Sequence, residues 1–156
     1  MFPRRPYAAG VGIAAAVQSN FLRVHQAIYE GTGGLIGHRT IGVPCLLMTS
    51  VGRRTGKPRT AALVYAKDGD SFVVTASNGG ADRPPAWLHN VKARPDVEVR
   101  IGRRRHAAVA EVVGPDHPEY DRLWKLVNDT NRGRYDRYQT RTQRPIELVR
   151  LSRAQE

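Results

Sequence analysis

An Asp-Gly turn between two apolar segments most constrains how this chain can fold. The turn is Asp68-Gly69-Asp70, and the apolar segments occupy about 59–67 before it and 71–77 after it. Asp-Gly is a strong short-range hairpin signal, because glycine readily takes the positive φ that tight hairpin turns need. The two flanking segments are therefore predicted to pair as antiparallel strands.

The other apolar segments are equally short. Further strands are expected over 45–49, 97–101, 104–113 and 145–151, with a tight turn at Gly102-Arg103. Pro84-Pro85 opens a helix over about 85–93, since proline suits a first helical turn, and a second helix follows 114–116 with Asp116 as its N-cap. Antiparallel strands with short covering helices predict a small barrel of about six strands, in the α+β or all-β class.

The first forty residues follow a different pattern. Residues 1–10 carry two prolines and two arginines and are predicted to form a loose arm. Over 11–30 apolar residues recur every three or four positions, which predicts an amphipathic helix that ends at the glycines of 31–34. We expect this helix to pack on the barrel, with contact to a membrane surface as the alternative. Residues 1–156 are interpreted as a single domain, with the barrel over 40–152.

Charge and cysteine content narrow the classes of function. The net charge of +11 implies affinity for polyanions, whether nucleic acid, anionic lipid or a phosphorylated ligand. The single cysteine, Cys45, excludes an intramolecular disulfide and fits a reducing compartment. No apolar run approaches the ~20 residues of a membrane span. We therefore expect a cytoplasmic protein.

Two glycine-containing segments predict a ligand site. The first is a turn opened by Gly52 and Gly56 that carries four cations within seven residues: Arg53, Arg54, Lys57 and Arg59. Such a turn can direct backbone N–H groups and guanidinium forks at one anion. The second is Gly79-Gly80, which follows a strand end and lets a flat ligand approach the backbone closely. Together they predict a site for a planar cofactor with an anionic tail.

Side chains near these segments can complete the site. Ser77 can hydrogen-bond a cofactor ring and Trp87 can pack against it, with Asn90 on the same face of that helix. Core packing is the alternative for Trp87, and a helix-end cap is the alternative for Asn90. Tyr135 and Tyr138 share a face on a helical turn, where a phenol can donate a proton or hydrogen bond to a substrate. Ordinary half-exposed tyrosines are the alternative.

Other kinds of site are not indicated. The five histidines are scattered and do not form zinc-ligand spacing with Cys45, so we expect no metal. There is no Walker A motif, no dinucleotide-binding fingerprint and no Gly-x-Ser-x-Gly. Redox chemistry by a bound cofactor remains, in which the protein supplies position, hydrogen bonds and anion contacts.

Three ordered motifs resemble the deazaflavin-dependent nitroreductase family of actinobacteria. They are 51–59, 76–80 and 85–90, and the segment 135–144 resembles the closing motif of that family. The resemblance covers about 33–151. It implies a split β-barrel that binds coenzyme F420, an 8-hydroxy-5-deazaflavin whose tail carries a phosphate and oligoglutamate. It also implies hydride transfer from the reduced coenzyme to a quinone, a nitroaromatic or another activated acceptor.

The resemblance further implies roles for individual residues. Arg53, Arg54 and Arg59 would hold the phosphate and tail, and Ser77 with its neighbours would contact the deazaflavin ring. Tyr135 and Tyr138 would line the acceptor pocket, so Ser77 and Tyr135 are the predicted catalytic residues. The full set of predicted cofactor contacts is Thr49, Arg53, Arg54, Thr55, Gly56, Lys57, Arg59, Tyr65, Ala76, Ser77, Asn78, Gly79, Trp87 and Asn90.

Two other interpretations stay open on the sequence alone. An FMN-binding split barrel would offer a similar pocket to a shorter anionic tail. A nucleic-acid-binding protein would account for the net charge of +11. Against nucleic acid, the arginines are spread along the chain, and Tyr65 and Phe72 do not form a platform for base stacking. The expected partner is a small-molecule electron acceptor, for a monomer or a homodimer.

Overall fold

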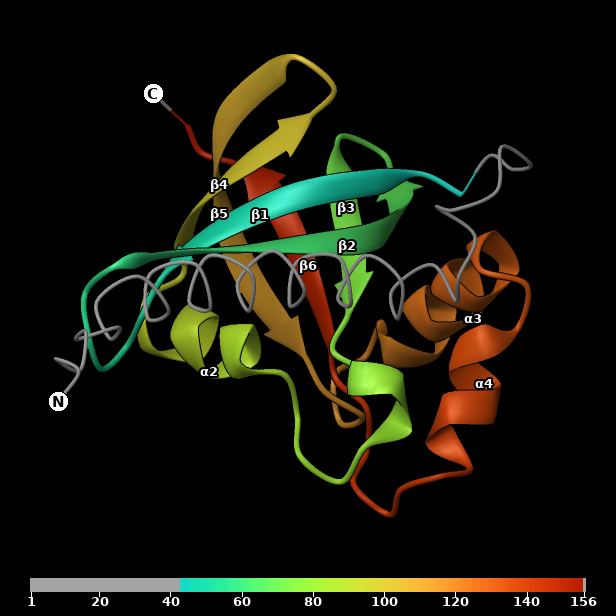
Figure 1. Cartoon of the computed structure of the whole chain (residues 1–156). Helices are drawn as coiled ribbons and strands as arrows, with labels where there is room; N and C mark the ends of the chain where they lie inside the picture. Colours follow the sequence, from blue (N-terminus) through green and yellow to red (C-terminus); the bar gives the residue numbers. More distant parts are fainter. Residues whose placement is uncertain (1–42, 156) are drawn as a thin grey trace, which may run out of the picture.

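A closed barrel of six strands, with short helices beside it, makes up the described part of the computed structural model, residues 43–155 (Figure 1). The predicted arm over 1–10 and helix over 11–30 lie outside the described residues. The strands are β1 Cys45–Val51, β2 Pro58–Asp68, β3 Ser71–Thr75, β4 Asp96–Ile101, β5 Arg104–Val113 and β6 Leu148–Arg153. The helices are the 3-10 turn η2 Asn78–Gly80, α2 Ala86–Ala93, α3 Tyr120–Thr130 and α4 Arg134–Gln139.

The strands follow the order β1-β2-β3-β6-β5-β4, and β4 returns to β1 to close the barrel. Every neighbouring pair is antiparallel. Both predicted hairpins are present, with Gly69 and Gly102 each at φ +58° in the turns. The prediction of a six-stranded, mostly antiparallel barrel is confirmed.

Three local predictions differ from the structure. Asp116 is not the N-cap of α3, because two further turns carry the chain to Glu119 before Tyr120 begins the helix. The strand predicted over 71–77 ends at Thr75, where the chain turns into η2. The strand predicted over 145–151 begins only at Leu148.

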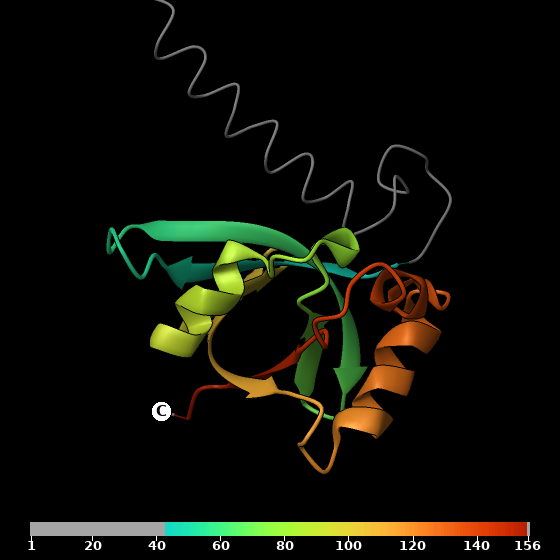
Figure 2. The ribbon, with the colours of Figure 1, turned by 90° about the horizontal axis from the view of Figure 1, so that it is seen from below.

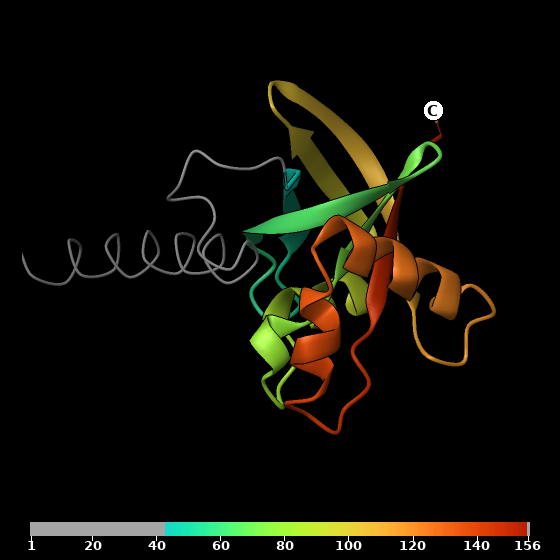
Figure 3. The same ribbon diagram turned by 90° about the vertical axis from the view of Figure 1, so that its right-hand side faces the viewer.

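Apolar side chains form two cores, one inside the barrel and one outside it. The first includes Met48, Val99 and Leu151, all almost fully buried. The second lies where α3 and α4 cover the outer face of the sheet, and it includes Val73, Leu148, Leu123, Val127 and Tyr135. Alternate residues of β3 and β6 enter different cores, as strand geometry requires. Figure 3 shows α3 and α4 on this side of the barrel.

Ion pairs fasten the start of α3 to the barrel. The Arg122 guanidinium donates to both carboxylate oxygens of Asp68, at 2.9 and 3.0 Å. The Glu119 carboxylate accepts from Arg122 and from Arg150 of β6. These hydrogen bonds from arginine lower the pKa of Asp68 and the pKa of Glu119. The arginines of this region are therefore engaged within the protein.

Candidate functional site

The basic turn between β1 and β2 is compact and internally bonded. The Gly52 N–H donates to the Lys57 carbonyl, and the Gly56 N–H donates to the Gly52 carbonyl, both at 2.8 Å. A Cβ at Gly52 would lie 2.8 Å from Thr55 Oγ1, and Gly56 has φ +68°. Both glycines are therefore needed for this turn, the first for space and the second for its backbone conformation.

Asn90 of α2 holds the turn in place. Its Oδ1 accepts from the Arg53 N–H at 3.1 Å, and its Nδ2 donates to Ser50 Oγ at 3.4 Å. The side chain is buried, with 5% of its surface exposed. Asn90 was predicted as a direct cofactor contact, but the oxygen and the nitrogen of its side-chain amide both form hydrogen bonds within the protein. The structure therefore supports a positioning role.

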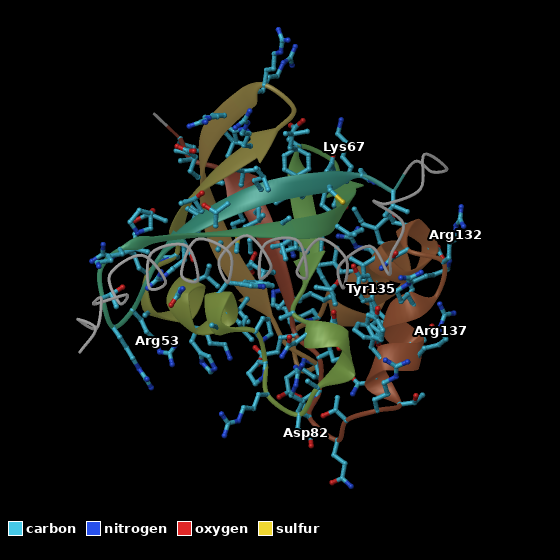
Figure 4. All side chains as sticks on the ribbon, in the orientation of Figure 1. Arg53, Lys67, Asp82, Arg132, Tyr135 and Arg137 are labelled. Carbon is cyan, nitrogen blue, oxygen red and sulfur yellow. The ribbon has the colours of Figure 1, made fainter. Side chains whose placement is uncertain are left out.

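The cations of the turn are exposed and form no ion pair with a carboxylate of residues 43–155. This holds for Arg53, Arg54, Lys57 and Arg59, whereas Arg122 and Arg150 of α3 and β6 are paired. Figure 4 places Arg53 at the end of the barrel beside α2, where its side chain points outward. Thr49, just before the turn, is hydrogen-bonded across the strands to Thr60, with 2.8 Å between the two Oγ1 atoms. The surface can therefore take up an anion without breaking an existing ion pair there.

A second feature is the loop of residues 76–81 that follows β3 (the loop 76–81). Ser77 has right-handed backbone angles, while Asn78 and Gly79 have φ +44° and φ +65°. The N–H groups of Ser77, Asn78 and Gly79 donate to no acceptor within the described part of the chain. Successive N–H groups in such a right-then-left-handed arrangement form a concavity that binds anions or electronegative oxygens.

The helix α2 connects the two features. The loop 76–81 leads into α2, and α2 carries the Asn90 that holds the basic turn. Figure 2 shows α2, η2 and α4 arranged along one side of the barrel. The predicted anion-binding turn and the predicted ring-binding loop are therefore both joined to α2.

The two tyrosines of α4 occupy different environments. Tyr135 lies in the second core with 4% of its surface exposed, and burial raises its pKa to about 12. The nearby side chains of Thr75 and Asn131 partly counter the rise. Tyr138 is half-buried, with its ring 6.3 Å from the Tyr135 ring and 5.3 Å from the Arg141 guanidinium carbon. Its backbone carbonyl lies close to Gly80, so the backbone of α4 packs against the loop 76–81 at Tyr138.

Tyr65 and Trp87, both predicted cofactor contacts, pack against the barrel core. The Tyr65 ring meets Phe72 edge-on, with centroids 5.1 Å apart and planes at 78°. Tyr65 also lies in the part of β2 remote from the basic turn, next to the hairpin with β3. For Trp87 the packing agrees with the alternative of a core residue.

Residue-level reasoning missed the segment between α4 and β6. Arg144, Thr142 and Arg141 bond to the loop 76–81 or to Asp82, which follows it. In the sequence these residues stood out only as part of the closing motif. The segment also lines an open hollow on the surface, formed by Asp82, Thr140, Arg141, Thr142, Gln143 and Arg144.

Residues 43–155 contain neither a candidate metal site nor a membrane-spanning helix. No group of three or more His, Cys, Asp or Glu side chains could hold a metal ion there. No helix in that range is long and apolar enough to cross a membrane.

Comparisons with known proteins agree with this architecture. A family model described as F420H(2)-dependent quinone reductase matches residues 21–152. An F420H(2)-dependent quinone reductase of Mycobacterium tuberculosis is 51% identical over 133 residues, covering 85% of this chain and 89% of that protein. A solved F420-H2 dependent reductase (FDR-A) is 30% identical with a TM-score of 0.63, covering 72% of this chain and 100% of the other. A structure described as a domain-swapped dimer is 27% identical with a TM-score of 0.64, covering 86% and 99%.

Proposed function

Because the chain belongs to the F420H(2)-dependent quinone reductase family, we propose that it is an oxidoreductase that uses reduced F420 to reduce a quinone. One observation from the structure supports this most directly. The four cations of the turn, Arg53, Arg54, Lys57 and Arg59, are exposed without a carboxylate partner among the described residues, and α2 links them to a loop with three N–H groups that have no acceptor there either.

The residues present fit both parts of the coenzyme. The phosphate and glutamate tail is anionic, and the turn offers guanidinium and ammonium groups together with the N–H groups of Arg54 and Thr55, which have no acceptor among the described residues. The deazaflavin ring is flat and carries electronegative oxygens, which the N–H groups of the loop 76–81 can bind. The coenzyme, when bound, supplies the hydride, and the chain binds and orients it.

Within this proposal the predicted site residues divide into two groups. The turn residues 53–57 and Arg59 bind the tail, and Thr49 adjoins them on β1. Residues 76–79 bind the ring, with the N–H groups of Ser77 to Gly79 as donors. Asn90 positions the turn through its bonds to Arg53 and Ser50 rather than by touching the coenzyme.

For the acceptor, Tyr138 is the better-placed tyrosine. Its side chain is half-buried and its backbone packs on the loop 76–81, whereas Tyr135 is buried and its pKa is raised to about 12. We expect Tyr138→Phe to lower kcat/KM for a quinone about fivefold without changing the melting temperature, since one hydrogen bond is worth about 1 kcal/mol. Tyr135→Phe should leave kcat/KM close to that of the parent. Steady-state kinetics with menadione tests both, and a larger loss for Tyr135→Phe would restore Tyr135 as the catalytic tyrosine.

The proposed function is tested by fluorescence titration of the whole protein with F420, FMN and a short DNA duplex, each at two salt concentrations. Tight binding of F420, weak binding of FMN and no salt-resistant binding of DNA are expected. Turnover of reduced F420 with a quinone should follow. Preference for FMN would identify a flavin protein, and binding of DNA alone would mean that the net charge serves nucleic acid.

Three further predictions concern context. Membrane contact by the helix predicted over 11–30 lies outside the described residues, and vesicle co-sedimentation of the full chain tests it. Location in the cytoplasm is predicted from the single cysteine and from the lack of a long apolar run in the sequence, and cell fractionation tests it. Monomer and homodimer are separated by light scattering; a similar solved structure is described as a domain-swapped dimer.

A further inference from the structure

We propose that Arg144 is a positioning residue that fixes the loop 76–81 in the conformation that receives the cofactor ring. The assignment of this loop to the ring rests on the proposed function. The contact between Arg144 and the loop does not. Arg144 touches neither acceptor nor coenzyme in this proposal and acts through the loop backbone.

The loop needs support from outside itself. Asn78, Gly79 and Gly80 all have positive φ, at +44°, +65° and +82°, a region that residues other than glycine rarely adopt. Two backbone hydrogen bonds lie within the loop. The Gly80 N–H donates to the Ser77 carbonyl at 2.8 Å, and the Ala81 N–H donates to the Asn78 carbonyl at 3.1 Å. Only Asn78 is unusual in having a positive φ, but two successive glycines leave the backbone free to move, so the loop needs further contacts to keep one conformation.

Arg144 supplies those contacts to both ends of the loop. Its Nε donates to the Ala81 carbonyl at 2.8 Å, its Nη1 to the Ala76 carbonyl at 3.2 Å and its Nη2 to the Ser77 carbonyl at 2.8 Å. The planar guanidinium, with donors in a fixed fork, suits three carbonyls that converge on it. One side chain therefore ties the entry of the loop to its exit.

Arg144 is itself held in place. Its N–H donates to Thr142 Oγ1 at 3.2 Å, and its carbonyl accepts from Gln139 Nε2 at 2.8 Å. Thr142 Oγ1 in turn donates to Asp82 Oδ1 at 3.0 Å. Partial burial lowers the pKa of Arg144, which the charges of Glu147 and Asp82 partly counter. No carboxylate of the described chain forms an ion pair with it, so carbonyl oxygens satisfy this cation.

The position of the charge affects the donors that face the ligand. The Ala76 carbonyl and the Ser77 N–H belong to one peptide unit, and the Ser77 carbonyl and the Asn78 N–H belong to the next. A cation bonded to each oxygen polarises both units, which strengthens the two N–H donors. The Ser77 and Asn78 N–H groups are the donors that have no acceptor among residues 43–155. Arg144 therefore both aims and strengthens the donors of the loop.

The experiment compares Arg144→Gln and Arg144→Lys with the matched control Arg137→Gln. Arg137 is an exposed arginine of α4 with one long bond to the Arg132 carbonyl at 3.5 Å. Amide hydrogen exchange of the coenzyme-free protein measures the loop directly. Faster exchange at Gly80 and Ala81 is expected in Arg144→Gln, partial recovery in Arg144→Lys and no change in Arg137→Gln.

Binding is then measured with F420 and with a deazaflavin that lacks the phosphate and glutamate tail. Arg144→Gln should weaken both ligands about tenfold, because the ring contact is affected and the tail contact is not. KM for reduced F420 should rise by a similar factor, with a smaller change in kcat. If Arg144→Gln lowers the melting temperature, the binding measurements are made with Arg144→Lys instead, which keeps the positive charge.

The two proposals fail in different ways. Unchanged exchange and unchanged affinities in Arg144→Gln would overturn the positioning role while leaving the reductase assignment intact. Absence of F420 binding in the parent protein would overturn the proposed function, and the exchange data would still decide whether Arg144 fixes the loop.

Discussion

Replacing Arg54 and Arg59 together by alanine is expected to weaken F420 binding on the order of a hundredfold. A hydrogen bond to a charged group contributes about 1.5–3 kcal/mol, and because these side chains are exposed we take the lower end, so two such contacts contribute about 3 kcal/mol, or roughly a hundredfold. Both side chains are exposed and form no ion pair with a described carboxylate, so the melting temperature should change little. Fluorescence titration with F420 measures the loss, and the tail-free deazaflavin should bind the variant as well as the parent.

A matched control separates a specific anion site from a general effect of net charge. Arg103→Ala with Arg104→Ala removes the same charge from the hairpin between β4 and β5. Figures 1 and 3 show this hairpin projecting at the end of the barrel opposite α2. We expect the control to bind F420 within about twofold of the parent at 0.15 M salt, where screening extends over ~8 Å. Equal losses from the two double variants would contradict an anion site at the turn.

The two arginine experiments examine opposite ends of one ligand. Substitutions at the basic turn should discriminate between F420 and the tail-free deazaflavin. Substitution of Arg144 should affect both ligands alike. That contrast does not depend on the absolute affinity of either ligand. It therefore assigns the turn to the tail and the loop 76–81 to the ring in a single set of titrations.

The barrel could be predicted because its strands are joined by local signals. Asp68-Gly69-Asp70 and Gly102-Arg103 each fix a hairpin, and β5 begins and ends where the sequence pattern predicts, at 104 and 113. The wrong N-cap shows the limit of this reasoning. Asp116 suits a cap by residue type, but the turns over 114–119 delay the helix until Tyr120.

The support of the candidate site could not be predicted, because it depends on contacts between distant residues. Asn90 bonds to Arg53 across 37 positions, and Arg144 bonds to Ser77 across 67. Residue type and spacing do not identify such partners. The two tyrosines show the same limit. Their spacing on α4 places Tyr135 and Tyr138 near each other, but only the packing of the second core buries the first and leaves the second half-buried at its edge.

Gly80 is the position where a single methyl group is expected to be most disruptive. A Cβ there would lie 2.5 Å from the Tyr138 carbonyl oxygen and 3.1 Å from its Cα, and φ is +82°. Both the contact and the backbone conformation oppose a side chain. We expect Gly80→Ala to lower the free energy of unfolding by about 2–4 kcal/mol, combining overpacking with the left-handed conformation. Urea unfolding measures the change.

Gly79→Ala is the matched control, because it separates the two causes. Gly79 has φ +65°, but a Cβ there would meet no atom within 4 Å. Its cost should therefore be the conformational part alone, about 1 kcal/mol. The excess cost at Gly80 then measures how closely α4 packs on η2, the contact that brings Tyr138 to the loop 76–81. Equal costs at the two glycines would mean that α4 yields to the methyl group, and Gly80→Ala should then leave kcat/KM for the quinone unchanged.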